Sequence, residues 1–157
     1  MPATLHGSCR CGTVSFTVES HTPVPYQLCY CSVCRKTAGG AGAAINLAAD
    51  AATLRHFGRT RVWHAPLDTG PSPAERHACE RCATALWLFD PRWPALVHPL
   101  ASAIDTQLPA APSRVHIMLR FKPAWVPARI EPGDAAFDEL PAQSIEEWHR
   151  TNGLWVA

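Results

Sequence analysis

Seven cysteines are the residues of this sequence with the clearest chemical potential, and they fall into three short groups. Cysteine thiolates bind soft metal ions such as zinc, form disulfides or act as nucleophiles. An odd number of cysteines, in a chain that shows no export signal, argues against a framework of disulfides. We therefore interpret the three groups as metal ligands: Cys9 with Cys11, Cys29 with Cys31 and Cys34, and Cys79 with Cys82.

The spacing within these groups suits tetrahedral zinc sites. Four thiolates bound to zinc at ~2.3 Å lie roughly 3.8 Å from one another. Cys9 and Cys11 can point to the same face of an extended chain, and Cys79 and Cys82 have the two-residue gap of a zinc knuckle. Each pair supplies half of a tetrahedron, whereas the middle group offers three sulfurs to a single ion. The spacing therefore favours a division of the ligands into four and three.

The favoured division separates a structural site from a reactive one. A site with four protein ligands is closed, whereas a site with three keeps one position free for water or substrate. A thiol that binds at the free position loses its proton, and the thiolate can attack a small carbonyl carbon. In a plainer alternative, both zinc ions only hold the loops of a small domain together. A different division also stays open, although its ligands are farther apart along the chain: Cys9, Cys11, Cys29 and Cys31 at one ion, with Cys34, Cys79 and Cys82 at the other.

The elements that must position these cysteines have the patterns of short strands. Apolar and polar residues alternate from 13 to 19, which is the period of a half-buried strand. Gly58 and Arg59 predict a hairpin turn between two further strands. A capping box at Ser144 and Glu147 opens a short helix that runs to about Arg150. The two strands that flank the hairpin turn are expected at 53–57 and 60–64, and four others at 26–28, 43–47, 85–89 and 115–119.

Length and composition limit the class of protein. A chain of 157 residues, of which 47% are hydrophobic, is expected to form one domain, and its 15 prolines favour a mainly β fold of short strands. The formal net charge of +1 argues against nucleic acid as a partner. The sequence has no run of about 18 apolar residues, so no membrane-spanning segment is predicted. No signal peptide is recognised either, and we therefore expect a cytoplasmic protein.

Several motifs together carry a resemblance to a known family: Gly7–Gly12, Cys29–Thr37, Cys79–Cys82, His116–Ile117 and Lys122–Val126. The sequence resembles the glutathione-dependent formaldehyde-activating enzyme family, also called the centromere protein V family. The resemblance covers roughly residues 5–126 and implies the Mss4-like zinc-binding fold of short antiparallel strands, with one short C-terminal helix. Residues 127–157 are then expected to be an extension that packs on the same domain. One departure is Ala83, which follows the last cysteine where the family usually has glycine.

The resemblance also implies ligand roles and an activity. The first and third cysteine groups match structural zinc ligands of the family, and Cys29, Cys31 and Cys34 match catalytic ones. Two zinc ions per chain are therefore expected. The implied activity is the condensation of glutathione with formaldehyde to S-hydroxymethylglutathione, catalysed by an enzyme that is a carbon–sulfur lyase in the reverse direction.

Glutathione carries two carboxylates, so its binding site should offer cations and backbone N–H donors. Arg35 and Lys36 directly follow the middle cysteine group, and Gly39 and Gly40 permit a close approach of backbone and ligand. In the alternative interpretation, Arg35 only neutralises the thiolates and Lys36 is only solvated. We predict that these four residues contribute to the thiol-binding site.

The functions of two further residues, His116 and Trp125, are less defined by the sequence. They are candidates for the same cleft, although a single histidine on an apolar strand more often belongs to the core. The competing function is a non-catalytic, zinc-stabilised interaction module. Such a module should have a basic extension or a cationic face, and the charge balance argues against one. The expected partner is therefore a small-molecule thiol such as glutathione, with a homodimer left open.

Overall fold

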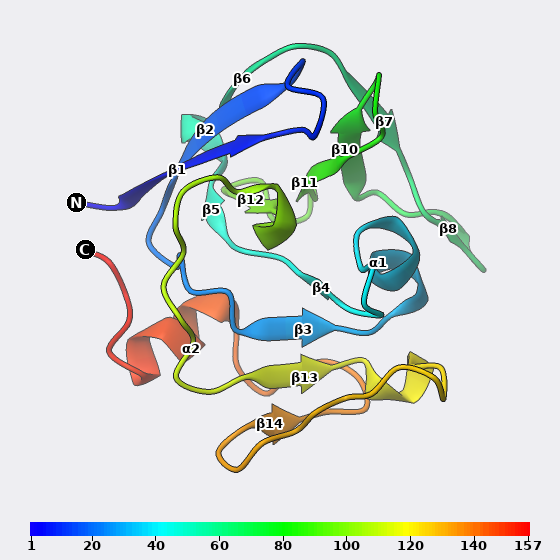
Figure 1. Cartoon of the computed structure of the whole chain (residues 1–157), viewed down its shortest axis with the longest axis vertical. Helices are drawn as coiled ribbons and strands as arrows, with labels where there is room; N and C mark the ends of the chain where they lie inside the picture. Colours follow the sequence, from blue (N-terminus) through cyan, green and yellow to red (C-terminus); the bar gives the residue numbers. More distant parts are fainter.

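The computed structural model, which describes residues 1–157, is built on three main sheets of short strands that long connections join (Figure 1). The first sheet is antiparallel and has three strands in the order β1 (Ala3–Ser8), β2 (Ser15–Ser20) and β6 (Arg55–Phe57). The turn between β1 and β2 carries Cys9 and Cys11. This sheet therefore places the first cysteine pair at one of its ends.

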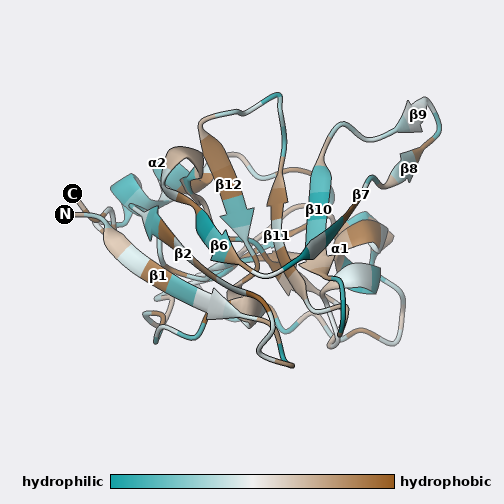
Figure 2. Ribbon diagram, turned by 90° about the horizontal axis from the view of Figure 1, so that it is seen from above, coloured by the Kyte–Doolittle hydropathy of each residue, from teal (hydrophilic) through white to brown (hydrophobic).

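The second sheet is antiparallel and has five strands. Its order is β5 (Ala49–Asp50), β12 (Leu96–Pro99), β11 (Ala85–Phe89), β10 (Glu75–Cys79) and β7 (Thr60–Trp63). The last residue of β10 is Cys79, so this sheet positions the third cysteine group. Beyond β7, a small hairpin of β8 (Pro66–Leu67) and β9 (Gly70–Pro71) projects from the molecule (Figure 2).

The third sheet has four strands and is mixed. Its order is β14 (Ala135–Ala136), β13 (Val115–Ile117), β3 (Gln27–Cys29) and β4 (Ala44–Ile45). β13 is parallel to both β14 and β3, whereas β3 is antiparallel to β4. The chain leaves β3 directly into the helix α1 (Ser32–Thr37), and this step contains the middle cysteine group. Three single-turn 3₁₀ helices complete the connections: η1 (Ala51–Thr53), η2 (Ala101–Ala103) and η3 (Leu119–Phe121).

One buried core cluster extends across all three sheets, and its centre lies between the first two. The rings of Phe16 on β2 and Trp87 on β11 meet edge to face, with centroids 5.2 Å apart. Val18, Leu86 and Val97 are buried beside them. Apolar segments of β2, β11 and β12 appear brown in Figure 2. The cysteine clusters at the strand ends are therefore attached to a rigid, close-packed centre.

The C-terminal helix α2 (Ile145–Thr151) packs on the third sheet. Its N-terminus has the expected capping box, in which Ser144 and Glu147 exchange hydrogen bonds. The ring of Trp148 stacks on Tyr26, with centroids 3.6 Å apart. The two chain ends lie near each other in both views (Figures 1 and 2).

The predicted hairpin at Gly58 and Arg59 is wrong. β6 pairs with β2, and β7 pairs with β10, so the chain passes from the first sheet to the second at this turn. Gly58 has a φ of +88°, and a Cβ atom there would lie 2.1 Å from the carbonyl oxygen of Thr13. The turn is pressed against the β1–β2 connection, which separates the strands that flank it.

Other expectations are met at the level of fold class. The protein is mainly β, most strand pairs are antiparallel, and a helix lies near the C-terminus, as predicted. The sequence reasoning missed α1, because a six-residue helix that contains Cys34 and only one other apolar residue, Val33, has no apolar period of its own. It also did not identify β1, β10 and β12 as strands. Neither α1 nor α2 is long enough to cross a membrane.

Candidate metal centres

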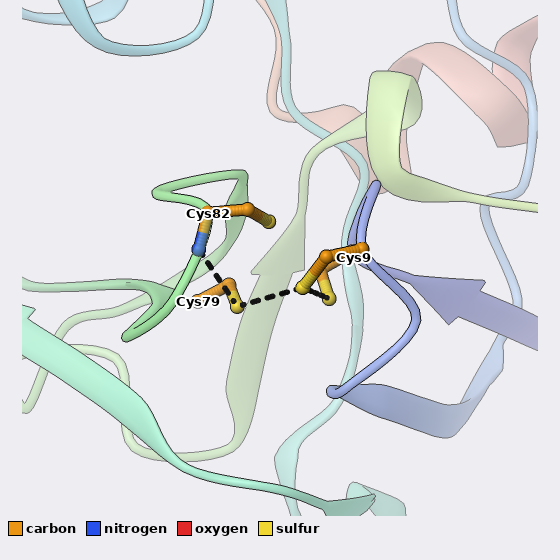
Figure 3. Close-up of side chains that lie close together, drawn as sticks. Cys9, Cys79 and Cys82 are labelled. Carbon is orange, nitrogen blue, oxygen red and sulfur yellow. Dashed lines mark hydrogen bonds between the residues drawn. The ribbon is translucent and has the colours of Figure 1, made fainter.

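Four cysteines from two turns converge between the first and second sheets (Figure 3). Cys9 and Cys11 lie in the β1–β2 turn, Cys79 ends β10, and Cys82 lies in the turn that follows. Their Sγ atoms all lie within 4.8 Å of one another, with 3.5 Å between Cys9 and Cys11 and 3.8 Å between Cys11 and Cys79. These distances match the sulfur spacing of a zinc tetrahedron, roughly 3.8 Å, so the donor set of this four-cysteine cluster fits zinc.

Hydrogen bonds to sulfur favour the thiolate form of two members of the four-cysteine cluster, Cys9 and Cys82, whereas the pKa of Cys11 is raised. The Thr84 hydroxyl lies 3.1 Å from the Cys82 Sγ, and this contact is the main cause that lowers the pKa of Cys82 to about 5. Burial raises the pKa of Cys9, but the Val14 N–H, which donates to its Sγ at 3.2 Å, and neighbouring side chains lower it to about 7. The N–H of Cys82 donates to the Cys79 Sγ at 3.4 Å. The cluster is therefore arranged to hold negative charge.

The other three cysteines form a second cluster at the junction of β3 and α1. Cys29 ends β3, Cys31 is the N-cap of α1, and Cys34 lies within the helix. The N–H of Cys34 donates to the Cys31 Sγ at 3.3 Å. Hydrogen bonds with Cys29 and Cys34 lower the pKa of Cys31 to about 2, whereas its contact with Cys31 raises the pKa of Cys29. This three-cysteine cluster therefore concentrates thiolate character on the N-cap sulfur.

The two clusters divide the seven sulfurs into four and three. The alternative grouping, with Cys29 and Cys31 beside Cys9 and Cys11, is not formed. No fourth cysteine, histidine or carboxylate joins the three-cysteine cluster within the same range of distances. The cluster supplies three soft donors that fit zinc and leaves one of four tetrahedral positions without a protein ligand.

Two polar side chains that the sequence reasoning missed contact Cys34. Arg76 Nη2 and Asn46 Nδ2 each donate to the Cys34 Sγ at 3.9 Å. Arg76 lies on β10, so it approaches the three-cysteine cluster from the second sheet. No local pattern could have linked it to a sulfur 42 residues away.

The residues predicted to bind the thiol lie together, but beside the four-cysteine cluster. Arg35, Lys36, Gly39 and Gly40 line an open hollow of about 420 Å³ whose other wall includes Cys82. The Nε atom of Arg35 is buried without a hydrogen-bond partner. At Gly39, a Cβ atom would lie 2.7 Å from the backbone of Ala43. The missing side chain at Gly39 therefore makes room for the Ala43 backbone and not for a ligand.

His116 belongs to a buried hydrogen-bonded chain. Its Nδ1 lies 2.9 Å from the Tyr30 hydroxyl, and its Nε2 lies 3.3 Å from Oδ2 of Asp134. The backbone N–H of Arg114 is the main cause that lowers the pKa of Asp134, so an ionised carboxylate accepts from Nε2–H and leaves Nδ1 as an acceptor for the tyrosine. Tyr30 lies between Cys29 and Cys31 in the sequence. The hydrogen bonds from Tyr30 through His116 to Asp134 therefore hold the backbone of the three-cysteine cluster in place.

Trp125 has a different environment from His116. It is 68% exposed, whereas His116 is 1% exposed. Neither residue lines the hollow beside the four-cysteine cluster or the smaller one beside Arg76. The common cleft expected for these two side chains is therefore not found at either place.

Comparisons with known proteins identify the family of this chain. The family model described as glutathione-dependent formaldehyde-activating enzyme matches residues 4–120. A curated protein of Halomonas elongata, whose name provisionally gives it as a glutathione-dependent formaldehyde-activating enzyme, is 56% identical over 152 residues, which cover 96% of this chain and 97% of that protein. A crystal structure of a Rhodobacter sphaeroides protein aligns with a TM-score of 0.49 and 18% identity, over 84% of this chain and 98% of that one. By the family match and the curated relative, the chain belongs to the glutathione-dependent formaldehyde-activating enzyme family.

Proposed function

We propose that this protein condenses glutathione with formaldehyde to S-hydroxymethylglutathione. In this reaction the thiol sulfur bonds to the carbonyl carbon, the C=O π bond breaks, and the thiol proton passes to the oxygen. The reverse reaction cleaves the carbon–sulfur bond, which makes the enzyme a lyase. The family match and the name of the Halomonas relative support this pair of substrates.

The observation that carries the proposal is the difference between the two cysteine clusters. One has four sulfurs within 4.8 Å, and the other has three with no further protein ligand. Structural zinc sites have four protein ligands, whereas catalytic sites have three and an open position. Zinc bound by the three-cysteine cluster would hold the substrate sulfur as a thiolate and so make it a nucleophile at neutral pH.

The side chains around the three-cysteine cluster have separate tasks in this proposal. Cys29, Cys31 and Cys34 would be the protein ligands, and the lowered pKa of Cys31 prepares it for that role. Arg76 and Asn46 donate to the Cys34 Sγ and so offset the negative charge of three thiolates. Without these donors, the negative charge of the three thiolates would repel an anionic thiol more strongly.

We assign the four-cysteine cluster a structural role with a second zinc ion. Cys79 is 0% exposed, and the cluster joins the β1–β2 turn of the first sheet to the β10–β11 turn of the second. A metal held there links two elements that are distant in the sequence, and its binding energy is folding energy.

Two finer proposals concern the setting of the reaction. We propose residues 5–126 as the zinc domain and 127–157 as an extension of it, supported by the stacking of Trp148 on Tyr26. A reaction that consumes a free thiol needs a compartment that keeps thiols reduced, which supports a cytoplasmic location.

The proposal is tested by exchange NMR on the zinc-loaded protein. With ¹³C-labelled formaldehyde and glutathione at equilibrium, the protein should accelerate exchange between hydrated formaldehyde and S-hydroxymethylglutathione above the spontaneous rate. Cys31→Ser is the matched control, because serine keeps the N-cap of α1 and removes one sulfur ligand. A protein with two zinc ions per chain that leaves the exchange at the spontaneous rate would contradict the proposed activity.

A further inference from the structure

Two arginines on one face of the second sheet have no carboxylate partner. Arg76 on β10 lies opposite Trp63 on β7, and Ala78 lies opposite Arg61. Side chains two apart on a strand share a face, so Arg61 and Arg76 are diagonal neighbours on the same face. Neither arginine has an Asp or Glu oxygen within 4.0 Å, whereas the nearby Arg59 is paired with Glu80 at 3.2 Å. Two neighbouring cations without a carboxylate partner, one of which also contacts the Cys34 Sγ, point to an anionic ligand at this position.

These arginines line a hollow between the second sheet and α1. The hollow has a volume of about 180 Å³, and its walls include Trp63 and Leu88 from the sheet and Ala38 after α1. Because Arg76 Nη2 lies 3.9 Å from the Cys34 Sγ, the hollow adjoins the three-cysteine cluster. An anionic group bound here would therefore lie beside the sulfur chemistry proposed above.

The hollow continues into the larger one beside the four-cysteine cluster. Both are lined by the same four residues at their common boundary: Thr37, Ala38, Ala83 and Ala85. The larger hollow adds Arg35 and Lys36, and neither hollow is lined by an Asp or Glu. The combined groove has four cations with apolar walls between them, which suits a short peptide with carboxylates at its ends.

We propose that Arg76 and Arg61 are the specificity-determining residues for the thiol substrate, and that they bind a carboxylate of a peptide thiol whose sulfur lies at the three-cysteine cluster. A guanidinium matches a carboxylate with two parallel N–H donors, which a lysine cannot provide. Arg35, which lines the larger hollow, is then the partner of the second carboxylate. This proposal rests on the proposed function and names the class of thiol that the site selects.

The test compares glutathione with its diethyl ester, which has the same thiol but no free carboxylate. In zinc-loaded protein, Arg61→Ala should raise the Kd and KM for glutathione by about tenfold and leave those for the diester within about twofold. Arg76→Ala should raise the Kd for glutathione several-fold more than the Kd for the diester. Arg76→Lys should restore only part of the affinity for glutathione, because lysine keeps the positive charge but lacks the two parallel N–H donors of arginine. Raising the ionic strength should weaken binding of glutathione and not of the diester.

Arg59→Ala is the matched control, since it removes an equal charge from the same sheet region but only an exposed ion pair. Arg61 makes no contact with a cysteine sulfur, so its variant separates substrate binding from any effect of Arg76 on Cys34. Equal losses for glutathione and its diester in both variants would overturn the proposal, as would no loss in either. If calorimetry shows the ester-dependent difference but exchange NMR shows no catalysis, the binding subsite stands and the proposed reaction fails.

Discussion

At the scale of single residues, the cysteines of the two clusters should respond differently to the same substitution. Cys31 is the N-cap of α1, where a serine hydroxyl can accept the same hydrogen bond from the Cys34 N–H. We expect Cys31→Ser to lose one zinc per chain while it keeps the fold. Cys79 is 0% exposed within the four-cysteine cluster, so Cys79→Ser should unfold or aggregate.

Zinc content by mass spectrometry and thermal unfolding by circular dichroism check both variants. The expected pair of results is one zinc with a cooperative transition for Cys31→Ser, and no cooperative transition for Cys79→Ser. If both variants unfold to the same extent, the two clusters do not have the separate roles that we assign to them.

Ala83 has a left-handed backbone conformation. Its φ is 61°, and its N–H donates to the carbonyl of Cys79, so the knuckle requires this geometry. A side chain in this region costs roughly 1–2 kcal/mol, and glycine removes that cost but makes the unfolded chain more flexible. We expect Ala83→Gly to stabilise the protein by about 0.5–1 kcal/mol, measured by urea unfolding at fixed zinc. A loss of stability would show that the Ala83 methyl group packs favourably enough to outweigh the strain.

At the scale of elements, the turn at Gly58 separates two strands that the sequence pattern would pair. Gly58→Ala combines a φ of +88° with a Cβ placed 2.1 Å from the Thr13 carbonyl oxygen, and backbone cannot yield as a flexible side chain can. The unfolding free energy should fall by more than about 2 kcal/mol, since clash adds to strain. Gly153→Ala is the control, because its φ is +67° and nothing lies within 4 Å of the added Cβ. Equal losses in urea unfolding of the two variants would mean that contact with Thr13 is unimportant.

The same elements show how far the sequence was informative. The cysteine division was predictable because each group is local in the chain, and the capping box was predictable for the same reason. The pairing of β6 and β7 was not, because a turn pattern records the local bend but not the partner across the sheet. The contact of Arg76 with Cys34 depends on how the second sheet packs against α1, so no spacing in the sequence reports it.

At the scale of the whole molecule, stability should fall on mild acidification through His149. Its Nε2 accepts from the Val24 N–H at 3.1 Å, and its Nδ1 lies 2.8 Å from the Ile145 carbonyl oxygen, which suits the neutral ring. Burial lowers the pKa of His149 below the usual 6.5, so the unfolded chain binds its proton first. The stabilisation is therefore complete above pH 6.5 and is lost as pH falls below that value toward the folded pKa.

His149→Gln supplies the comparison, because glutamine can accept from the Val24 N–H and does not titrate. Urea unfolding at pH 7.5 and 5.5, with zinc held constant, should show a smaller loss in the variant than in the original protein. The difference between the two proteins cancels acid effects on the thiolates. If the variant and the original protein lose stability equally on acidification, His149 does not contribute to this pH dependence. The pKa of its ring, measured by NMR titration, would then be near 6.5.

The four-cysteine cluster also has a consequence for how the chain reaches its fold. Cys11 and Cys79 are 68 residues apart in the sequence, so the two sheets must find each other by a search over a long loop. If the local Cys79–Cys82 knuckle binds zinc first, two coordination positions of the ion stay free for Cys9 and Cys11. Binding of the β1–β2 turn to this ion would then bring the two sheets together in one step. We therefore expect the refolding rate to rise with free zinc until the knuckle is saturated. A newly made chain in a zinc-depleted cell would then remain longer in a form that proteases can cut.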